Sequence, residues 1–415
     1  MQPLLALWPV TSRGGGNFGV GMWTEPILHV DMDAFFVEVE RLRDPSLVGK
    51  AVAVGGAGKR GVIASASYEA RAHGVRSAQP TTTALLVCRD LVVVPPSHER
   101  YGEMSSRVFE VFREFTPYVE GLSLDEAFLD VSGLRRHFAT AVEVAVAVRS
   151  EIRGQIGLPA SVGIAASKFM AKIASESAKP DGYRHIPKDT ELEFLHALPV
   201  EALWGVGPAT LAGLQRLGVV TIGDLAELPE PTVLGSLGPT QGRHLLDLAR
   251  GIDHRPVTPD TEAKSISVEE TYDRDLQGRD LIETALLAHA QRLAVRLHRS
   301  GLAARTVTLK VRYDDFTTVT RSVTPGGAVD SPRDLYARAR DLLGTVDLDR
   351  PVRLLGLGGS SLEAAKDPRQ LLIDSDESWA AVTEAVAEVR ERFGEHSVEP
   401  ARLLGGVLPD EESDR

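Results

Sequence analysis

The 415-residue sequence predicts an α+β protein that contains two ferredoxin-like units. Apolar periodicity gives the order strand, helix, strand, strand, helix, strand twice, once within residues 27–177 and again within residues 264–357. The stretch between them, residues 188–255, instead shows short helical patterns separated by glycine turns. A chain of this length has room for several domains, so we expect a small helical domain between two ferredoxin-like ones.

The first unit opens with a short apolar run suited to a buried strand. Its elements are expected at residues 27–31 (strand), 101–115 (helix), 118–122 and 126–131 (a strand hairpin), 140–156 (helix) and 160–165 (strand). Ser167 then caps a further helix. Residues 36–96 follow the first strand and are therefore an insertion in this unit.

The second unit repeats the order of elements but not the sequence. Its elements are expected at residues 264–271, 279–299, 305–313, 317–323, 332–343 and 352–357. The strand 305–313 places apolar residues on one face and polar residues on the other, namely Thr306, Thr308, Lys310 and Arg312. Charge alone favours a solvated surface here; the alternative is a face that binds a phosphate backbone.

Composition excludes several classes of protein. The single cysteine, Cys88, rules out an internal disulfide and a metal site built from clustered cysteines. No apolar run approaches the roughly 20 residues of a membrane span, so we expect a cytoplasmic protein without membrane association. The net charge of −12 argues against a polyanion partner, but residues 363–415 alone hold 14 acidic and 6 basic side chains. Most of the excess negative charge therefore lies in the tail.

Acidic residues gather at predicted strand ends. Asp31 and Asp33 flank Met32 at the end of the first strand, and Asp125 and Glu126 open a later one. Converging carboxylates repel one another, and divalent cations relieve that repulsion. Two Mg²⁺ ions about 3.5–4 Å apart would activate an attacking oxygen and stabilise a leaving one. Strand-end caps and turn acids explain the spacing equally well, and the adjacent pair can share a site only at an irregular strand end.

Two further patterns suit phosphate groups. Gly205, Val206 and Gly207 precede a helix that begins with a proline, so free N–H groups there could meet a phosphate, as in a helix-hairpin-helix motif. Two cationic residues also stand beside hydroxyl or turn residues: Arg71 follows Ser65, Ser67 and Tyr68, and Lys179 precedes a Pro-Asp-Gly turn. An ordinary turn and exposed helix ends are the simpler alternatives. Together with a carboxylate cluster, these cations would match a triphosphate.

Five motifs occur in a family order. They are residues 31–36 (DMDAFF), 68–71 (YEAR), 123–130 (SLDEAFLD), 168–174 (KFMAKIA) and 178–182 (AKPDG). The chain from about residue 27 to 362 resembles the Y-family translesion DNA polymerases, and is most similar to their DinB branch. This resemblance implies addition of deoxynucleotides to a primer 3′ end opposite damaged template, with low fidelity and no proofreading domain, in DNA repair.

The resemblance also implies a domain layout. By this resemblance, the palm would comprise residues 25–35 and 97–187, and the fingers residues 36–96. A helix-hairpin-helix thumb would follow at 188–255, then a linker at 256–264 and the little finger at 265–362. Residues 1–24 are expected to form a disordered extension, and residues 363–415 an acidic tail with an amphipathic helix at 379–393. The fold class is thus a ferredoxin-like palm with inserted fingers, a helical thumb and a ferredoxin-like little finger.

Residue roles follow from the same resemblance. The catalytic metal ligands would be Asp31, Asp125 and Glu126, which with the Met32 carbonyl would hold two Mg²⁺ ions, Mn²⁺ being possible. Nucleotide-binding residues would be Phe35, Phe36, Ser65, Tyr68, Arg71 and Lys179, with Phe36 as the steric gate against ribose. DNA-binding residues would be Gly205, Val206, Gly207, Arg296, Lys310 and Arg312.

The implied partners are primer-template DNA and deoxynucleoside triphosphates, bound by a monomer. Residues 370–374 occupy the place of a sliding-clamp motif but lack its aromatic end. Two alternative functions stay open. Another two-metal palm enzyme, such as a nucleotide cyclase, would need no duplex-binding hairpin. A catalytically silent DNA-binding scaffold would not need the intact carboxylates.

Overall fold

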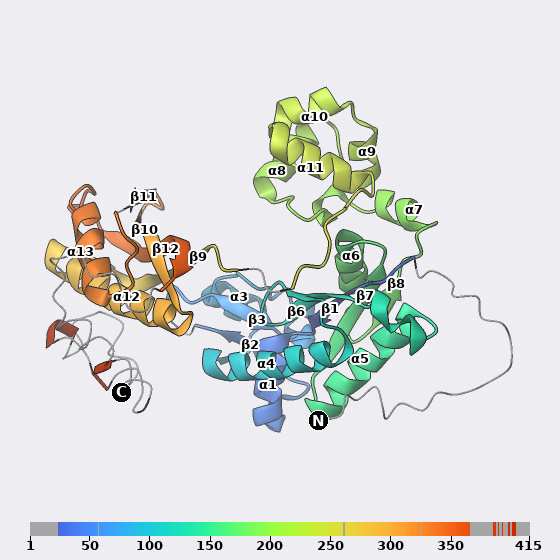
Figure 1. Cartoon of the computed structure of the whole chain (residues 1–415), viewed down its shortest axis with the longest axis horizontal. Helices are drawn as coiled ribbons and strands as arrows, with labels where there is room; N and C mark the ends of the chain where they lie inside the picture. The colour runs from blue at the N-terminus through green and yellow to red at the C-terminus, as the bar shows by residue number, and fades with distance from the viewer. Residues whose placement is uncertain are drawn as a thin grey trace, which may run out of the picture. The chain divides into compact units, whose positions relative to one another are not determined.

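The computed structural model describes residues 24–56, 58–259, 262–324 and 326–365, with scattered positions between 385 and 403. The chain forms two compact units (Figure 1). One takes up the described residues as far as 259 apart from 58–60, and the other takes up 58–60 and the described residues from 262 onward. Among the described helices, none is both long and apolar enough to cross a membrane.

The first unit contains a five-stranded sheet in the order β5-β6-β1-β7-β8. These strands are β5 (Val119–Gly121), β6 (Glu126–Asp130), β1 (Ile27–Met32), β7 (Ala160–Ala165) and β8 (Tyr183–His185). The central strand β1 pairs antiparallel with both β6 and β7, and its Asp31 lies opposite Glu126 on one side and Ser161 on the other. The edge strand β8, parallel to β7, was not predicted from the sequence.

Helices cover both faces of this sheet (Figure 1). Alternate residues of β1 divide between the two faces: Leu28 and Val30 pack with α4 (His98–Phe115) and α5 (Ala141–Gln155), whereas Ile27 packs with α6 (Lys168–Ala178). His29 and Asp31 therefore share the α6 side. The second turn of α6 lies close to β7 because Gly163 has no side chain there.

The insertion after β1 forms its own small layer. It contains the sheet β3-β2-β4 and three helices. Their bounds are β2 (Val52–Gly55), β3 (Ile63–Ala66), β4 (Val92–Val94), α1 (Phe35–Arg43), α2 (Tyr68–Ala72) and α3 (Thr81–Val87). The turn from β1 into α1 passes through Ala34 in a left-handed conformation with φ of 45°. This tight turn places the residues that follow β1 beside the strand end.

Short helices follow the sheet, as the glycine turns predict. They are α7 (Glu191–His196), α8 (Pro208–Arg216), α9 (Ile222–Glu227), α10 (Glu230–Leu237) and α11 (Pro239–Ala249). Leu214 and Leu245 from these helices share one apolar cluster with Phe169 of α6. Single 3₁₀ turns occupy Pro45–Leu47, Ser132–Arg136, Val200–Ala202 and Ala401–Leu403.

The second unit is an antiparallel sheet in the order β11-β10-β12-β9 with two helices packed into its apolar core. Its elements are β9 (Ser265–Leu276), α12 (Arg279–Arg299), β10 (Leu302–Tyr313), β11 (Thr318–Val323), α13 (Pro332–Leu343) and β12 (Val352–Ala364). The order of these elements along the chain is the predicted one, and the α+β class is confirmed; within the sheet, however, the first strand β9 lies at an edge, whereas β1 is central in the first unit. Strand β12 continues past the predicted end at residue 357, because β10 and β9 pair with it on both sides.

Three expectations fall outside what the structure describes. Residues 1–23, the clamp-like segment 370–374 and most of the predicted helix at 379–393 are not among the described residues. The disordered extension, the clamp motif and the amphipathic tail therefore stay predictions.

Candidate active site

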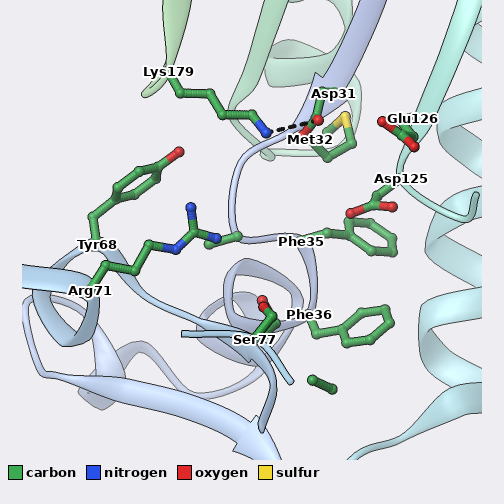
Figure 2. A pocket seen from close by; sticks show the side chains of 13 residues that line it. Asp31, Met32, Phe35, Phe36, Tyr68, Arg71, Ser77, Asp125, Glu126 and Lys179 are labelled. Carbon is green, nitrogen blue, oxygen red and sulfur yellow. Dashed lines mark hydrogen bonds and ion pairs between the residues drawn. The ribbon is translucent and has the colours of Figure 1, made fainter. Parts of the chain in front are cut away.

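A cavity of about 240 Å³ lies between the end of β1 and the insertion (Figure 2). The structure brings together around it every residue that the sequence analysis proposed for metal or nucleotide binding. They are Asp31, Met32, Asp125 and Glu126 together with Phe35, Phe36, Ser65, Tyr68, Arg71 and Lys179. Ala34, Ala64 and Ser77 complete the lining and were not predicted. Carboxylates from the sheet thus face the same space as cations from two other segments.

The carboxylates converge because two strand ends meet. Asp31 and Glu126 lie opposite each other in the β1–β6 register. Asp125 precedes β6 in a turn where the Ser123 hydroxyl donates to its Oδ1 over 2.5 Å. The Met32 N–H donates to the Asp125 carbonyl over 2.9 Å, which ties the turn to β1. Asp125 and Glu126 face one cavity because Asp125 stands outside the regular strand.

Two lysines neutralise this acidic group. Lys179 Nζ lies 2.8 Å from Asp31 Oδ2, and Lys172 Nζ lies 2.5 Å from Glu126 Oε2. Burial raises the pKa of Asp31 to about 6, although Lys179 opposes the rise. Burial would also raise the pKa of Glu126, but the His29 ring beside it and the Lys172 ammonium outweigh burial and lower that pKa to about 2. The carboxylate oxygens suit a hard divalent cation, which would take over the role of the ammonium groups.

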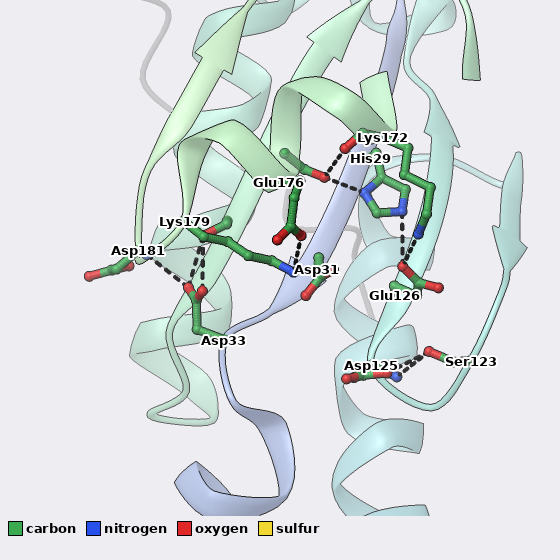
Figure 3. A network of polar contacts seen from close by, with 12 residues as sticks. His29, Asp31, Asp33, Ser123, Asp125, Glu126, Lys172, Glu176, Lys179 and Asp181 are labelled. Carbon is green, nitrogen blue, oxygen red and sulfur yellow. Dashed lines mark hydrogen bonds and ion pairs between the residues drawn. The ribbon is translucent and has the colours of Figure 1, made fainter. Parts of the chain in front are cut away.

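His29 is a member of this group that the sequence analysis missed. Its ring is fully buried, with Nε2 3.3 Å from Glu126 Oε2 and Nδ1 2.7 Å from the Ser175 hydroxyl (Figure 3). Ligand atoms of His29, Asp31 and Glu126 all lie within 4.8 Å of one another, and Asp125 stands outside this tight cluster. Burial lowers the pKa of His29. The sequence offered one indication of this placement: His29 and Asp31 are two residues apart on one strand, so their side chains lie on the same face of the sheet.

The opposite wall of the cavity carries the predicted nucleotide-binding residues. Arg71 lies over the Tyr68 ring, with its guanidinium carbon 4.8 Å from the centroid, and its Nε donates to the Ala66 carbonyl over 2.9 Å. Tyr68 donates its hydroxyl to Asp33 Oδ1 over 2.5 Å. Burial raises the pKa of Tyr68. The wall therefore presents a guanidinium held in place by an aromatic ring and a backbone carbonyl.

Phe35 and Phe36 take different positions at the start of α1. The Phe35 side chain is buried in the core, whereas Phe36 is partly buried. Both contribute to the cavity lining (Figure 2). Phe36 is therefore the more accessible of the two from the cavity.

The predicted DNA-binding residues fall into separate groups. Gly205 has φ of 101°, which favours glycine, and Gly207 precedes Pro208 at the start of α8. Lys310 and Arg312 lie on the polar face of β10, where Lys310 Nζ is 2.7 Å from Glu269 Oε2. Arg296 instead donates to the Ser267 carbonyl of the edge strand β9 over 2.7 Å. The structure does not place Arg296 in the row with Lys310 and Arg312.

A ferredoxin-like sheet with acidic residues at the end of its central strand, an insertion carrying cations, and a second ferredoxin-like unit define the class of Y-family polymerases. Solved structures agree on the fold. A chimera of the Y-family DNA polymerases Dbh and Dpo4 superposes with a TM-score of 0.73 over 81% of this chain and 99% of its own, at 24% identity. At that identity the likeness concerns the fold alone.

Sequence comparisons identify the family. Residues 30–176 match the impB/mucB/samB family and residues 263–373 match its C-terminal domain. A DNA polymerase IV of Desulfatibacillum aliphaticivorans is 43% identical over 92% of this chain and 97% of its own length. A DNA polymerase IV of Streptomyces coelicolor is 47% identical over 82% of this chain and 72% of its own. The chain therefore belongs to the impB/mucB/samB family, and the resemblance seen in its motifs is confirmed.

Proposed function

We propose that this chain is a translesion DNA polymerase that adds deoxynucleotides to a primer 3′ end by two-metal nucleotidyl transfer, with low fidelity and without proofreading, in DNA repair and damage tolerance. The observation that carries the proposal is the charge arrangement of one cavity. Asp31, Asp125 and Glu126 face it from the sheet, and Arg71 and Lys179 face it from other segments. A metal-bound triphosphate needs carboxylates that hold the metal ions and cationic side chains that bind the phosphate oxygens.

The carboxylates would hold two divalent ions, Mg²⁺ or alternatively Mn²⁺. Their ligands would be Asp31, Asp125 and Glu126 with the Met32 carbonyl. When bound, such ions lower the pKa of a primer 3′ hydroxyl and neutralise charge on departing pyrophosphate. The register of β1 and β6 fixes Asp31 opposite Glu126 before any ion arrives. This preorganisation supports the assignment, because little rearrangement is needed in the reaction.

The remaining residues would position the substrates. Ser65, Tyr68, Arg71 and Lys179 would hold the triphosphate, while Phe36 would lie beneath the sugar and exclude a 2′-hydroxyl. Primer-template DNA would contact the hairpin Gly205, Val206 and Gly207, and the polar face that carries Lys310 and Arg312. Arg296 remains a predicted contact at the sheet edge. A monomer suffices for this reaction. We further propose that residues 370–374 contact a sliding clamp and that the protein is located in the cytoplasm.

Primer extension with the double variant Asp125→Ala, Glu126→Ala tests this function. We expect a loss of about 10³-fold or more in rate, because both ions lose ligands. The matched control is Glu110→Ala, since Glu110 is an exposed acid on α4 that does not line the cavity. Extension by the double variant at the wild-type rate would contradict the metal assignment. A nucleotide cyclase would form cyclic product without any template, and a silent scaffold would bind DNA without extending it.

A further inference from the structure

Asp33 accepts hydrogen bonds from three segments that are distant in sequence. Its Oδ1 lies 2.5 Å from the Tyr68 hydroxyl, its Oδ2 lies 2.8 Å from the Asp181 backbone N–H, and the Ser161 hydroxyl reaches both oxygens at 3.1 and 2.9 Å (Figure 3 shows the contact with Asp181). The side chain is only 2% exposed. A carboxylate so deeply buried is stable because these donors surround it.

The position of Asp33 in the sequence suggests a metal ligand, but its contacts indicate otherwise. It is the second acid of the segment 31–33, yet it does not line the cavity that Asp31 lines. A carboxylate has about four acceptor sites, and the Tyr68 hydroxyl, the Ser161 hydroxyl and the Asp181 N–H together engage both oxygens of Asp33. The chain leaves β1 after Met32 and turns through Ala34, which carries the Asp33 side chain away from Asp31. Both oxygens of Asp33 thus bind donors of the protein, and the side chain stands outside the cavity lining.

The donors to Asp33 sit beside the two cations of the cavity. Tyr68 lies under the guanidinium of Arg71, at 4.8 Å from ring centroid to guanidinium carbon. Asp181 stands two residues after Lys179, whose ammonium group faces the carboxylates. Asp181 is itself held by Arg149 at 2.8 Å and by Arg153 at 2.6 Å. Asp33 thus joins the segment that carries Arg71 to the segment that carries Lys179.

We propose that Asp33 is a positioning residue that sets the affinity for the incoming triphosphate and binds no metal. By holding Tyr68 on the inserted layer and Asp181 beside β8, it fixes the spacing of Arg71 and Lys179 across the cavity. A triphosphate bridging these cations depends on that spacing, since misplacement of charged groups weakens every contact at once. This inference rests on the proposed function and refines it.

Single-nucleotide insertion by Asp33→Asn tests the proposal. An amide cannot accept all the hydrogen bonds that the carboxylate accepts, so the Tyr68 or Asp181 contact is lost. We expect KM for the deoxynucleotide to rise about 10-fold while kcat changes by less than about 3-fold. The Mg²⁺ concentration for half-maximal rate stays at the wild-type value. Asp31→Asn, by contrast, raises that Mg²⁺ requirement.

Two further variants show whether Asp33 acts through Tyr68. Tyr68→Phe removes the hydroxyl donor and keeps the ring, and we expect a similar rise in KM. Combining it with Asp33→Asn adds little, because both changes break the same contact. Factors that multiply in the double variant would overturn the coupling. Ser161→Ala is the matched control, since it leaves the bonds of Asp33 to Tyr68 and Asp181 in place, and its KM stays within about 2-fold.

Other outcomes overturn the proposal and are separable from failure of the function itself. A shifted Mg²⁺ requirement with unchanged KM would make Asp33 a metal ligand, and unchanged kinetics would remove any role. If the wild-type chain extends no primer, the proposed function fails. Calorimetric binding of deoxyadenosine triphosphate with Mg²⁺ still tests Asp33 in that event, with about 10-fold weaker binding expected for Asp33→Asn. Should Asp33→Asn misfold in a thermal scan, Asp33→Glu, which keeps the charge but displaces the carboxylate from its donors, carries the same measurement.

Discussion

The ring of Phe36 lies stacked on the ring of Tyr101, with centroids 4.2 Å apart and planes inclined by 12°. Tyr101 is fully buried, and its hydroxyl donates to Glu40 Oε1 over 2.9 Å. Arg100 also contacts this carboxylate, at 3.1 Å. The Phe36 ring is therefore packed against a buried ring that is itself held by a hydrogen bond. A side chain that excludes a larger sugar by steric hindrance needs such a fixed position.

Removal of the Phe36 ring should admit ribonucleotides. We expect Phe36→Ala to lower discrimination between dCTP and CTP by about 10²-fold, measured as the ratio of kcat/KM values, with little change in dCTP use. Tyr101→Leu should lower it in part, because Phe36 loses its backing. Tyr101→Phe keeps the stack and serves as the control. Unchanged sugar discrimination in Phe36→Ala would remove the residue from the gate role.

Gly163 allows α6 to approach the five-stranded sheet closely. A Cβ atom there would overlap the Ala171 carbonyl oxygen and the Ser175 nitrogen, both backbone atoms of α6. We expect Gly163→Ala to lower the free energy of unfolding by more than about 3 kcal/mol, measured by denaturant titration. Gly102→Ala is the control, since a Cβ there meets nothing within 4 Å. Because alanine favours the helix more than glycine does, this variant should raise the free energy of unfolding by about 0.5–1 kcal/mol. Equal stability of both variants would refute the packing argument.

The polar face of β10 should determine the salt dependence of DNA binding. We expect the double variant Lys310→Ala, Arg312→Ala to reduce the slope of log Kd against log salt by about 2 units, one for each lost phosphate contact. Arg296→Ala should reduce the slope by less than the loss of Lys310 or Arg312, because the Arg296 guanidinium already donates to the Ser267 carbonyl of the edge strand. Glu269→Gln should strengthen binding by releasing Lys310. An unaltered slope in the double variant would indicate an ordinary solvated surface.

The second unit should lose stability in mild acid. His289 is fully buried, donates from Nε2 to the Leu355 carbonyl over 3.0 Å, and lies with Nδ1 2.8 Å from Arg292. Burial, aided by the charge of Arg292, lowers the pKa of His289 to about 4. The unfolded chain, with a histidine pKa of about 6.5, binds the proton first. Stability therefore falls as pH drops from about 6.5 toward 4, by at most about 1.4 kcal/mol per pH unit.

Scanning calorimetry between pH 5 and 7 measures this effect. We expect His289→Gln to show a weaker dependence of the melting temperature on pH than the wild type. His298→Gln is the matched control, because His298 is an exposed histidine on the same helix. Identical pH dependence in all three proteins would show that His289 does not carry the effect.

Sequence patterns predicted the parts of this molecule that obey local rules. Apolar periodicity located both ferredoxin-like units, and the paired acids marked the end of β1. The role of His29 could not be predicted, because it depends on Ser175 and Lys172, which α6 brings over the strand only after folding. The separate position of Asp33 could not be predicted either. Two acids two residues apart suggest a shared site, and only the turn at Ala34 separates their side chains. The end of β12 was missed because glycine and serine suggest a loop unless neighbouring strands are known.

The central place of β1 has a consequence for how the site opens. Because β1 is bonded along both edges, to β6 and to β7, Asp31 cannot be displaced by local fraying. Backbone amides of Val30 and its neighbours should exchange with deuterium only when the whole sheet unfolds, whereas those of the insertion exchange through smaller openings. We therefore expect the end of β1 that carries Asp31 to exchange more slowly than the insertion, which can adjust its position without opening the sheet.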